Sequence, residues 1–416
     1  MEQTFSEFLD RVCGQYAPRP AILETPDHPE SAITYAALRQ KILLRIRELE
    51  GKRTIVLRMA PGAEWIITMF AAVEGGHQTV LESITDPEIP ASVFDSASEY
   101  HPGHLLFFTS GTTGSGKAVV LSQAALLRSC WNGQQMLPCH SSDRILSMLP
   151  LSHVFGFVCT LLWPLSQGAC VQIGSGMRGF ATDPKAFRPT ILPVVPSLLT
   201  YLLKADALNS ELRVILAGAG PCRREVLSAV ARTGTSICFG YGLTETASGL
   251  AISRPGEDPF AMHLCPDTKI RIADDGELLV RTPCMMEGYF DDPAETAGRL
   301  SGGELHTGDL AELRDGALYI TGRKSDVLVM ENGEKIYCPE AEARLFSLLG
   351  REAALTLRGG VLTLVVAAPS SDYAAIAEKI AGYNREQPLG KKIQGLELRR
   401  QSLPRTATGK IQRWKL

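Results

Sequence analysis

The stretch Leu105–Gln123, LLFFTSGTTGSGKAVVLSQ, runs from an apolar segment into a loop of small and hydroxyl-bearing residues that ends at Lys117. Glycine lets backbone N–H groups approach an anion closely, and Lys117 adds a compact positive charge. The donors of the loop are the hydroxyls of Thr109, Ser110, Thr112 and Thr113 and the backbone at Gly111, Gly114 and Gly116. We therefore predict a phosphate-binding loop, held in place by the preceding strand.

Two kinds of phosphate loop compete for this stretch. Residues 111–118, GTTGSGKA, follow the G-x-x-x-x-G-K pattern of P-loop NTPases, but Ala118 has no hydroxyl for Mg²⁺. A P-loop also needs a helix directly after its lysine, whereas the β-branched run after Ala118 predicts a second strand. The stretch therefore favours a loop carried by a β-hairpin. An ordinary hairpin turn, the third alternative, needs neither a lysine nor so many hydroxyls.

The rest of the chain predicts an α/β fold in two parts. Short apolar strands alternate with helical stretches through residues 54–240, which indicates layers around a mostly parallel sheet. After Thr268 the pattern changes to hairpins across Asp275-Gly276 and Asp315-Gly316. A compact α+β unit follows from Arg323. Because 416 residues are too many for one compact core, we predict a large domain over residues 1–322 and a smaller one over residues 323–416.

Five segments in order along the chain carry a resemblance to a known family. They are TSGTTG with its following lysine, FGYGLTETAS at 239–248, LHTGDL at 305–310, GRKSDVLVMENGEKIYCPEAE at 322–342 and LPRTATGKIQR at 403–413. Together they resemble the adenylate-forming superfamily, which includes acyl-CoA and aryl-CoA ligases, luciferases and the adenylation domains of peptide synthetases. The resemblance implies a large N-terminal domain of layered α/β sheets with a small β subdomain, and a small mobile α+β C-terminal domain.

The resemblance also implies an activity and its site residues. ATP would activate a carboxylic acid as an acyl-adenylate with release of pyrophosphate, and the acyl group would pass to the thiol of coenzyme A. Catalytic roles fall on Thr109, Lys117, Glu245 and Lys410, with Glu245 as the Mg²⁺ ligand and Asp326 as the hinge. Nucleotide and coenzyme contacts are expected from the phosphate loop and from Gly218, Ala219, Gly220, Tyr241, Gly242, Thr244, Asp309, Arg323, Gly333, Glu334 and Lys335.

The acid is expected to bind near His153, Val195, Pro196 and Phe239. Their apolar or small surroundings favour an aryl or medium-length fatty acid over an amino acid. His153 has a second interpretation as a core imidazole, because its neighbours are apolar. Two alternatives for the activity stay open: transfer to the phosphopantetheine of an acyl-carrier protein, and a non-catalytic nucleotide-binding homologue.

The sequence departs from the family pattern in several places. Gly116 stands where proline is usual, Ala118 where glycine is, Gln123 where histidine is, and Ser325 where lysine is common. A glycine at 116 loosens the phosphate loop, so weaker ATP affinity is expected. Only about 30 residues separate GAEWIITMFAAVEGGHQTVL from the loop, and this shortening predicts that one α/β layer is trimmed.

Composition bounds the remaining properties. A formal net charge of −3 gives no reason to expect a nucleic-acid partner. The ten cysteines show no metal-like spacing, which predicts reduced thiols in a cytoplasmic protein. The most apolar run, VFGFVCTLLWPL at 154–165, is shorter than the ~20 residues of a membrane span, so we predict a core segment or a pocket wall. The N-terminus lacks the features of a signal peptide. The sequence leaves the oligomeric state open.

Overall fold

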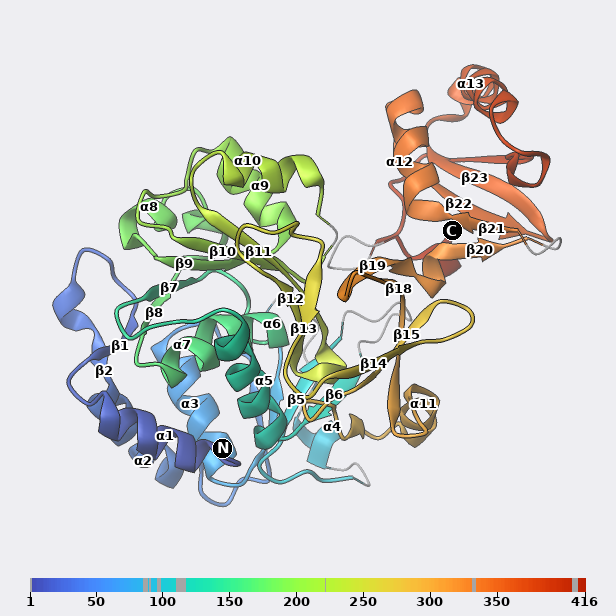
Figure 1. The fold of residues 1–416 in the computed structure, drawn as a ribbon. Coiled ribbons are helices and arrows are strands. Elements are labelled where there is room, and N and C mark those ends of the chain that lie inside the picture. The colour runs from blue at the N-terminus through green and yellow to red at the C-terminus, as the bar shows by residue number, and fades with distance from the viewer. Residues whose placement is uncertain are drawn as a thin grey trace.

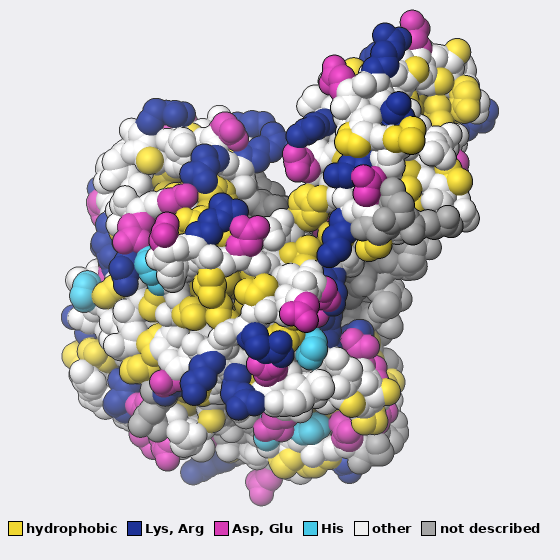
Figure 2. Space-filling model, turned by 45° about the vertical axis from the view of Figure 1, so that its right-hand side comes forward, with side chains coloured by type: hydrophobic (Ala, Val, Ile, Leu, Met, Phe, Trp, Pro, Cys, Tyr) yellow, Lys and Arg dark blue, Asp and Glu magenta, His cyan; other side chains and the backbone are white. Residues whose placement is uncertain are grey.

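The computed structural model describes residues 2–84, 89, 91–95, 99–109, 117–220, 222–330, 334–405 and 411–416. It has a large body and a C-terminal lobe that lies beside strands β18 and β19 (Figure 1). Figure 2 shows the surface recessed between the two, with Lys and Arg side chains on both sides of the recess. Within the described residues no helix is long and apolar enough to cross a bilayer.

The larger sheet has a parallel part and a longer antiparallel part. Strands β1, β8, β7, β9, β10 and β11 pair in parallel in that order, and antiparallel strands extend the sheet from β11 onward. Its strands are β1 (Pro20–Leu23), β2 (Ile33–Thr34), β7 (Arg144–Ser147), β8 (Cys170–Ile173), β9 (Ile191–Val194), β10 (Val214–Gly218), β11 (Ser236–Leu243), β12 (Ser248–Ser253), β13 (Met262–Leu264), β14 (Lys269–Ile272), β15 (Glu277–Arg281), β17 (Leu300–Ser301), β18 (Glu304–Arg314) and β19 (Ala317–Arg323). The β-rich part after Thr268 therefore continues the sheet of the α/β part.

The smaller sheet of the body carries the phosphate hairpin. It runs β16 (Gly288–Tyr289), β6 (Ala118–Leu121), β5 (Leu105–Phe108), β4 (Gln78–Leu81) and β3 (Thr54–Leu57). Strands β5 and β6 pair antiparallel, with Phe108 opposite Ala118. A strand and not a helix follows Lys117, so the hairpin prediction is confirmed and the P-loop alternative is wrong.

Helices fill the space around the two sheets and bury one large core. Their bounds are α1 (Phe5–Gln15), α2 (Tyr35–Leu49), α3 (Ala63–Glu74), α4 (Ala91–Asp95), α5 (Gln123–Met136), α6 (Val154–Gly156), α7 (Trp163–Ser166), α8 (Asp183–Phe187), α9 (Pro196–Lys204), α10 (Arg224–Ala231) and α11 (Pro293–Arg299). Nine of the twelve residues of α3 are buried, which is typical of a helix between two layers. Segment α6–α7, with the π-helical stretch η2 (Phe157–Leu162), is also almost wholly buried, so the core prediction for residues 154–165 is confirmed.

The C-terminal lobe has its own hydrophobic core. It consists of β20 (Val327–Val329), β21 (Lys335–Tyr337), α12 (Cys338–Leu349), β22 (Ala353–Arg358), β23 (Val361–Ala367), α13 (Tyr373–Arg385) and β24 (Gly395–Arg399). The buried residues of this core all lie between Ile336 and Ile393. The predicted strands and helices of residues 323–416 are thus present, and the exact boundary at residue 322 stays a prediction.

Candidate functional site

The neck of the phosphate hairpin is closed by backbone hydrogen bonding. The N–H of Thr109 donates to the carbonyl of Lys117 at 3.0 Å, directly after the last pair of β5 and β6. Both ends of the loop are therefore fixed to the smaller sheet. Six predicted donors lie outside the described residues: Ser110, Gly111, Thr112, Thr113, Gly114 and Gly116.

The ammonium of Lys117 lies among groups from a distant part of the chain. It forms an ion pair with Glu295 of α11 and lies 5.3 Å from the ring centre of Tyr289. Tyr289 is held there because β16 pairs with β6, with Tyr289 opposite Val119. Its hydroxyl donates to the carboxylate of Glu245 at 2.7 Å. One tyrosine thus joins the lysine of the phosphate loop to the carboxylate expected to bind Mg²⁺.

Glu245 is carried by a tight turn between β11 and β12. After Leu243 the chain makes one 3-10 turn over Thr244–Thr246, and Ala247 has a left-handed backbone with φ of 47°. The hydroxyl of Thr246 bonds both the N–H and the carbonyl of Leu243, which locks the turn. Thr244 and Glu245 are half-buried at its start. A carboxylate in this setting offers the oxygen ligand that Mg²⁺ prefers.

The packing of β11 against β12 requires glycine at position 242. A Cβ atom there would lie 1.5 Å from the carbonyl oxygen of Ser248, because β11 and β12 approach each other closely at the irregular step in their pairing. No other residue fits at position 242. The predicted contact of Gly242 with a nucleotide stays a prediction.

Asp309 forms the second charged centre of the site. It is buried, with 3% of its surface exposed, and accepts from the Tyr241 hydroxyl at 2.7 Å and from Arg323 Nε at 2.6 Å. Burial first, and the neighbouring carboxylate second, raise the pKa of Tyr241 well above its ordinary value, so its hydroxyl remains a donor. Burial alone would lower the pKa of Arg323, but the carboxylate outweighs it and raises that pKa. The three residues make one charge-assisted network.

The turn after β10 leaves room beside the backbone. Ala219 adopts a left-handed conformation with φ of 61°, between Gly218 and Gly220. A Cβ atom on Gly218 would lie 3.3 Å from the ring of Phe155, and one on Gly220 would lie 3.8 Å from Pro196. Phe155 therefore covers the backbone of β10 where the sequence predicts a flat group to bind. Sequence reasoning did not single out Phe155.

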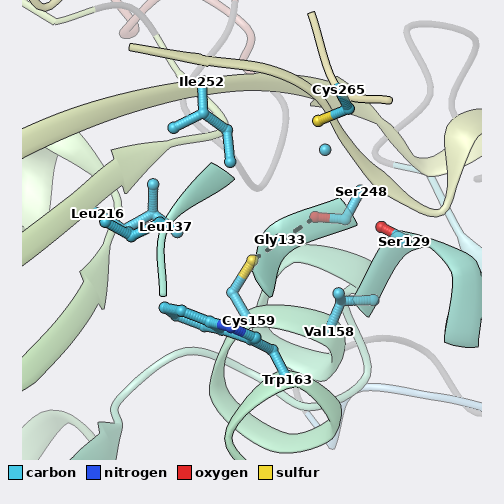
Figure 3. Close-up of a pocket in the computed structure, with 11 residues that line it drawn as sticks. Ser129, Gly133, Leu137, Val158, Cys159, Trp163, Leu216, Ser248, Ile252 and Cys265 are labelled. Carbon is cyan, nitrogen blue, oxygen red and sulfur yellow. Dashed lines mark hydrogen bonds between the residues drawn. The ribbon is translucent and has the colours of Figure 1, made fainter. Parts of the chain in front are cut away.

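A small apolar cavity of about 30 Å³ lies between α5, η2 and the larger sheet (Figure 3). Its lining residues are Ser129, Gly133, Leu137, Val158, Cys159, Trp163, Leu216, Ser248, Gly249, Ile252 and Cys265. None of the four predicted pocket residues is among them. Val195 and Phe239 pack instead in the core on the other face of the sheet, with Phe239 against Phe260.

His153 is exposed and precedes the first turn of α6. Its interpretation as a core imidazole is therefore wrong. A role at the mouth of an acyl pocket stays a prediction for this residue.

The predicted hinge is tied to both lobes. Lys324 donates to Asp275 at 2.7 Å and to Glu277 at 2.8 Å on the body, and Asp326 lies 3.7 Å from Arg413 of the C-terminal lobe. Glu277 is buried and also accepts from the N–H of Gly308, next to the network of Asp309. Neither Lys324 nor Glu277 was singled out from the sequence, although a glutamate opening an apolar strand is a signal that could have been used.

Two predicted residues of the C-terminal lobe fall outside the described ranges. They are Lys410 and Gly333. The described residues on either side of Lys410, Arg405 and Ile411, form an isolated β-bridge in the lobe, and Arg405 pairs with Glu352. Glu334 and Lys335 lie at the start of β21, where the carbonyl of Glu334 accepts from Met330. Tyr337 of the same strand packs on Gly322, at the junction of the lobes.

Residues 101–290 match the family model described as AMP-binding enzyme. The chain is 30% identical over 396 residues to an indoleacetate–CoA ligase of Aromatoleum aromaticum, covering 86% of this chain and 73% of that protein. The chain belongs to the AMP-binding enzyme family. A feruloyl-CoA synthase of an Amycolatopsis species is 28% identical, covering 78% of this chain and 72% of that protein. The sequence-based prediction of an adenylate-forming acid–thiol ligase is therefore confirmed.

Solved structures of the family's fold superpose along nearly the whole chain. O-succinylbenzoate coenzyme A synthetase (MenE) from Bacillus subtilis, bound to its acyl-adenylate intermediate, has a TM-score of 0.78 at 22% identity, covering 98% of this chain and 97% of that one. ATP-bound MatB from Rhodopseudomonas palustris has a TM-score of 0.80 at 19% identity, covering 97% of each chain. At this identity the likeness shows the fold alone, and the predicted two-part α/β architecture is confirmed.

Proposed function

We propose that this AMP-binding enzyme activates a carboxylic acid with MgATP as an acyl-adenylate, releases pyrophosphate and transfers the acyl group to coenzyme A. The observation that carries the proposal is the reach of one five-residue segment, 241–245, at the end of β11 and the start of the following turn. Tyr241 bonds Asp309 at one end, and Glu245 accepts from Tyr289, which lies beside Lys117, at the other. A nucleoside needs a hydroxyl acceptor and a triphosphate needs cations, and the two sets of groups are joined by this segment.

Each charged group at the two ends of this segment has a defined part in holding the nucleotide. Asp309 would accept from the ribose hydroxyls, because its carboxylate is oriented by Tyr241 and Arg323. Lys117 would hold the β- and γ-phosphates, after leaving Glu295. Glu245 fits a bound Mg²⁺ by the chemistry of its oxygen donors, and Mg²⁺ supplies charge neutralisation for the departing pyrophosphate.

Lys410 would bridge the acid's carboxylate and the α-phosphate, and rotation about Asp326 would then withdraw it so that a thiol can approach. The bridge between Arg405 and Ile411 supports this, because it ties both flanks of Lys410 to the C-terminal lobe.

The acid is proposed to be an aryl acid. The relatives named for indoleacetate, ferulate, 2-succinylbenzoate and 4-coumarate all act on acids that contain a ring.

Acid-dependent pyrophosphate release tests the proposal. A panel of aryl and fatty acids is incubated with MgATP, and AMP is expected to accumulate in step with pyrophosphate and acyl-CoA. Parallel reactions with coenzyme A and with a phosphopantetheinylated carrier protein decide the acceptor. Lys410→Ala is expected to abolish adenylate formation. Acid-independent production of ADP, or full activity of Lys410→Ala, would contradict the proposal.

A further inference from the structure

The hydroxyl of Ser129 is a polar group without a hydrogen-bond partner among the described residues. Only 3% of the surface of Ser129 is exposed, and its side chain lines the apolar cavity. Figure 3 shows Oγ of Ser129 directed inward, toward the side of the cavity where Ser248 and Cys159 lie. A buried hydroxyl left unpaired costs about 1–3 kcal/mol, so this position calls for an explanation.

The other polar groups of the cavity already pair with each other or are neutral. The thiol of Cys159 lies 3.9 Å from the hydroxyl of Ser248. Burial raises the pKa of Cys159 to about 12, and burial likewise raises the pKa of Cys265 to about 12, so both thiols stay uncharged. The indole N–H of Trp163 donates to Gln134 at 3.0 Å. Among the described residues, Ser129 therefore brings the one hydroxyl without a partner to this apolar lining.

The cavity lies deeper in the body than the turn after β10. Phe155 and Cys159 are one helical turn apart, and Phe155 covers Gly218 while Cys159 lines the cavity. Leu216, another lining residue, precedes Gly218 by two residues and therefore lies on the same face of β10. A group bound beside Gly218 with its carboxylate toward the nucleotide would point its far end toward this cavity.

We propose that Ser129 determines specificity by donating a hydrogen bond to a polar atom at the far end of the acid. The inference rests on the proposed function and names its substrate class: flat aromatic acids that carry a hydroxyl, a carbonyl or a ring nitrogen on the side opposite the carboxylate. The size of the space limits that group. About 30 Å³ is the space of one or two water molecules, so a hydroxyl fits and a bulky substituent does not.

The experiment compares acids that differ by one hydroxyl. The probes are 3-phenylpropenoic acid and its ortho-, meta- and para-hydroxy derivatives, with kcat/KM measured by pyrophosphate release. Wild-type protein is expected to prefer at least one hydroxy isomer by ~10-fold, as one buried hydrogen bond predicts. Ser129→Ala should reduce that preference to less than ~3-fold, because the donor is gone. Ser228→Ala, an exposed serine on α10, is the matched control and should leave it unchanged.

Two further measurements separate recognition from damage to the fold. Ser129→Cys keeps the shape of the side chain with a weaker donor, so its preference should lie between those of wild type and Ser129→Ala. Binding of each acid without ATP is followed by tryptophan fluorescence, since Trp163 forms part of the cavity wall. In wild type the hydroxy acid should bind more tightly than the parent acid, and in Ser129→Ala the two acids should bind equally.

The outcomes distinguish this inference from the proposed function. Equal kcat/KM for all four acids, or a preference that survives in Ser129→Ala, overturns the role of Ser129 and leaves acid activation standing. No acid-dependent pyrophosphate with any aryl or fatty acid overturns both.

Discussion

Glu295 is expected to weaken ATP binding, because its carboxylate occupies the ammonium that the triphosphate needs. The side chains of Lys117 and Glu295 are 26% and 34% exposed, so their ion pair is partly screened by water. Pairs of this kind contribute about 0.5–1 kcal/mol. Glu295 also lies 3.7 Å from Arg299, so its carboxylate keeps a positively charged neighbour when Lys117 moves to the triphosphate. Glu295→Gln should therefore tighten ATP binding about two- to fivefold, since 1.4 kcal/mol is a factor of ten.

Titration calorimetry with ATP in the absence of acid measures this effect. The gain in affinity should shrink as salt is raised from 0.05 to 0.5 M (~14 to ~4 Å Debye length), because exposed charges are screened. Glu340→Gln, which removes a similarly charged helix residue of the C-terminal lobe, is the matched control. In a Lys117→Met background the Glu295 substitution should have no effect. Unchanged or weaker ATP binding by Glu295→Gln alone would refute the competition between carboxylate and phosphate.

Three further outcomes follow from the contacts of the site. Tyr289→Phe removes the donor to Glu245 and should weaken MgATP binding ~10-fold, with little change for ATP measured in EDTA. Asp309→Asn should raise the KM for ATP at least ~10-fold, and 2′-deoxy-ATP should show a smaller effect of the substitution than ATP. Burial would raise the pKa of Glu277, but the hydrogen bonds from Lys324 and Gly308 and the nearby positive charges together outweigh burial and lower that pKa. The stabilising effect of Glu277 is therefore present above pH ~4.3 and lost as the pH falls through the lowered value. The difference in melting temperature between wild type and Glu277→Gln should accordingly be constant from pH 6 to 8 and shrink below pH ~4.

Local patterns predicted the elements and their order well. The β-branched run after Ala118 predicted the strand that pairs with β5, and Asp-Gly turns predicted both later hairpins. Such signals work because the side-chain period and turn chemistry act over a few residues. The family could also be identified from the sequence, because each of its motifs is a short continuous segment and the five occur in the expected order.

Pairing between strands far apart in the chain could not be predicted from the sequence. Nothing near Tyr289 in the sequence shows that β16 pairs with β6 and brings its ring beside Lys117, about 170 residues away in the chain. The sequence did not single out the cavity residues for the same reason: Phe239 and Leu216 lie on neighbouring strands but on opposite faces of the sheet. A shift of one residue along a strand moves a side chain to the other face of the sheet. Only the assembled sheet shows which face each side chain occupies.

The amino-acid sequence by itself determined the class of chemistry, the hairpin that holds the phosphate loop and the presence of two carboxylates, Glu245 and Asp309. The tertiary structure alone decided which groups meet in space: a tyrosine between lysine and glutamate, a competing carboxylate on α11, and a buried serine at the wall of an apolar cavity. The physical reason is that residue types and local spacing encode what a side chain can do, whereas strand pairing and helix packing determine the partners it meets.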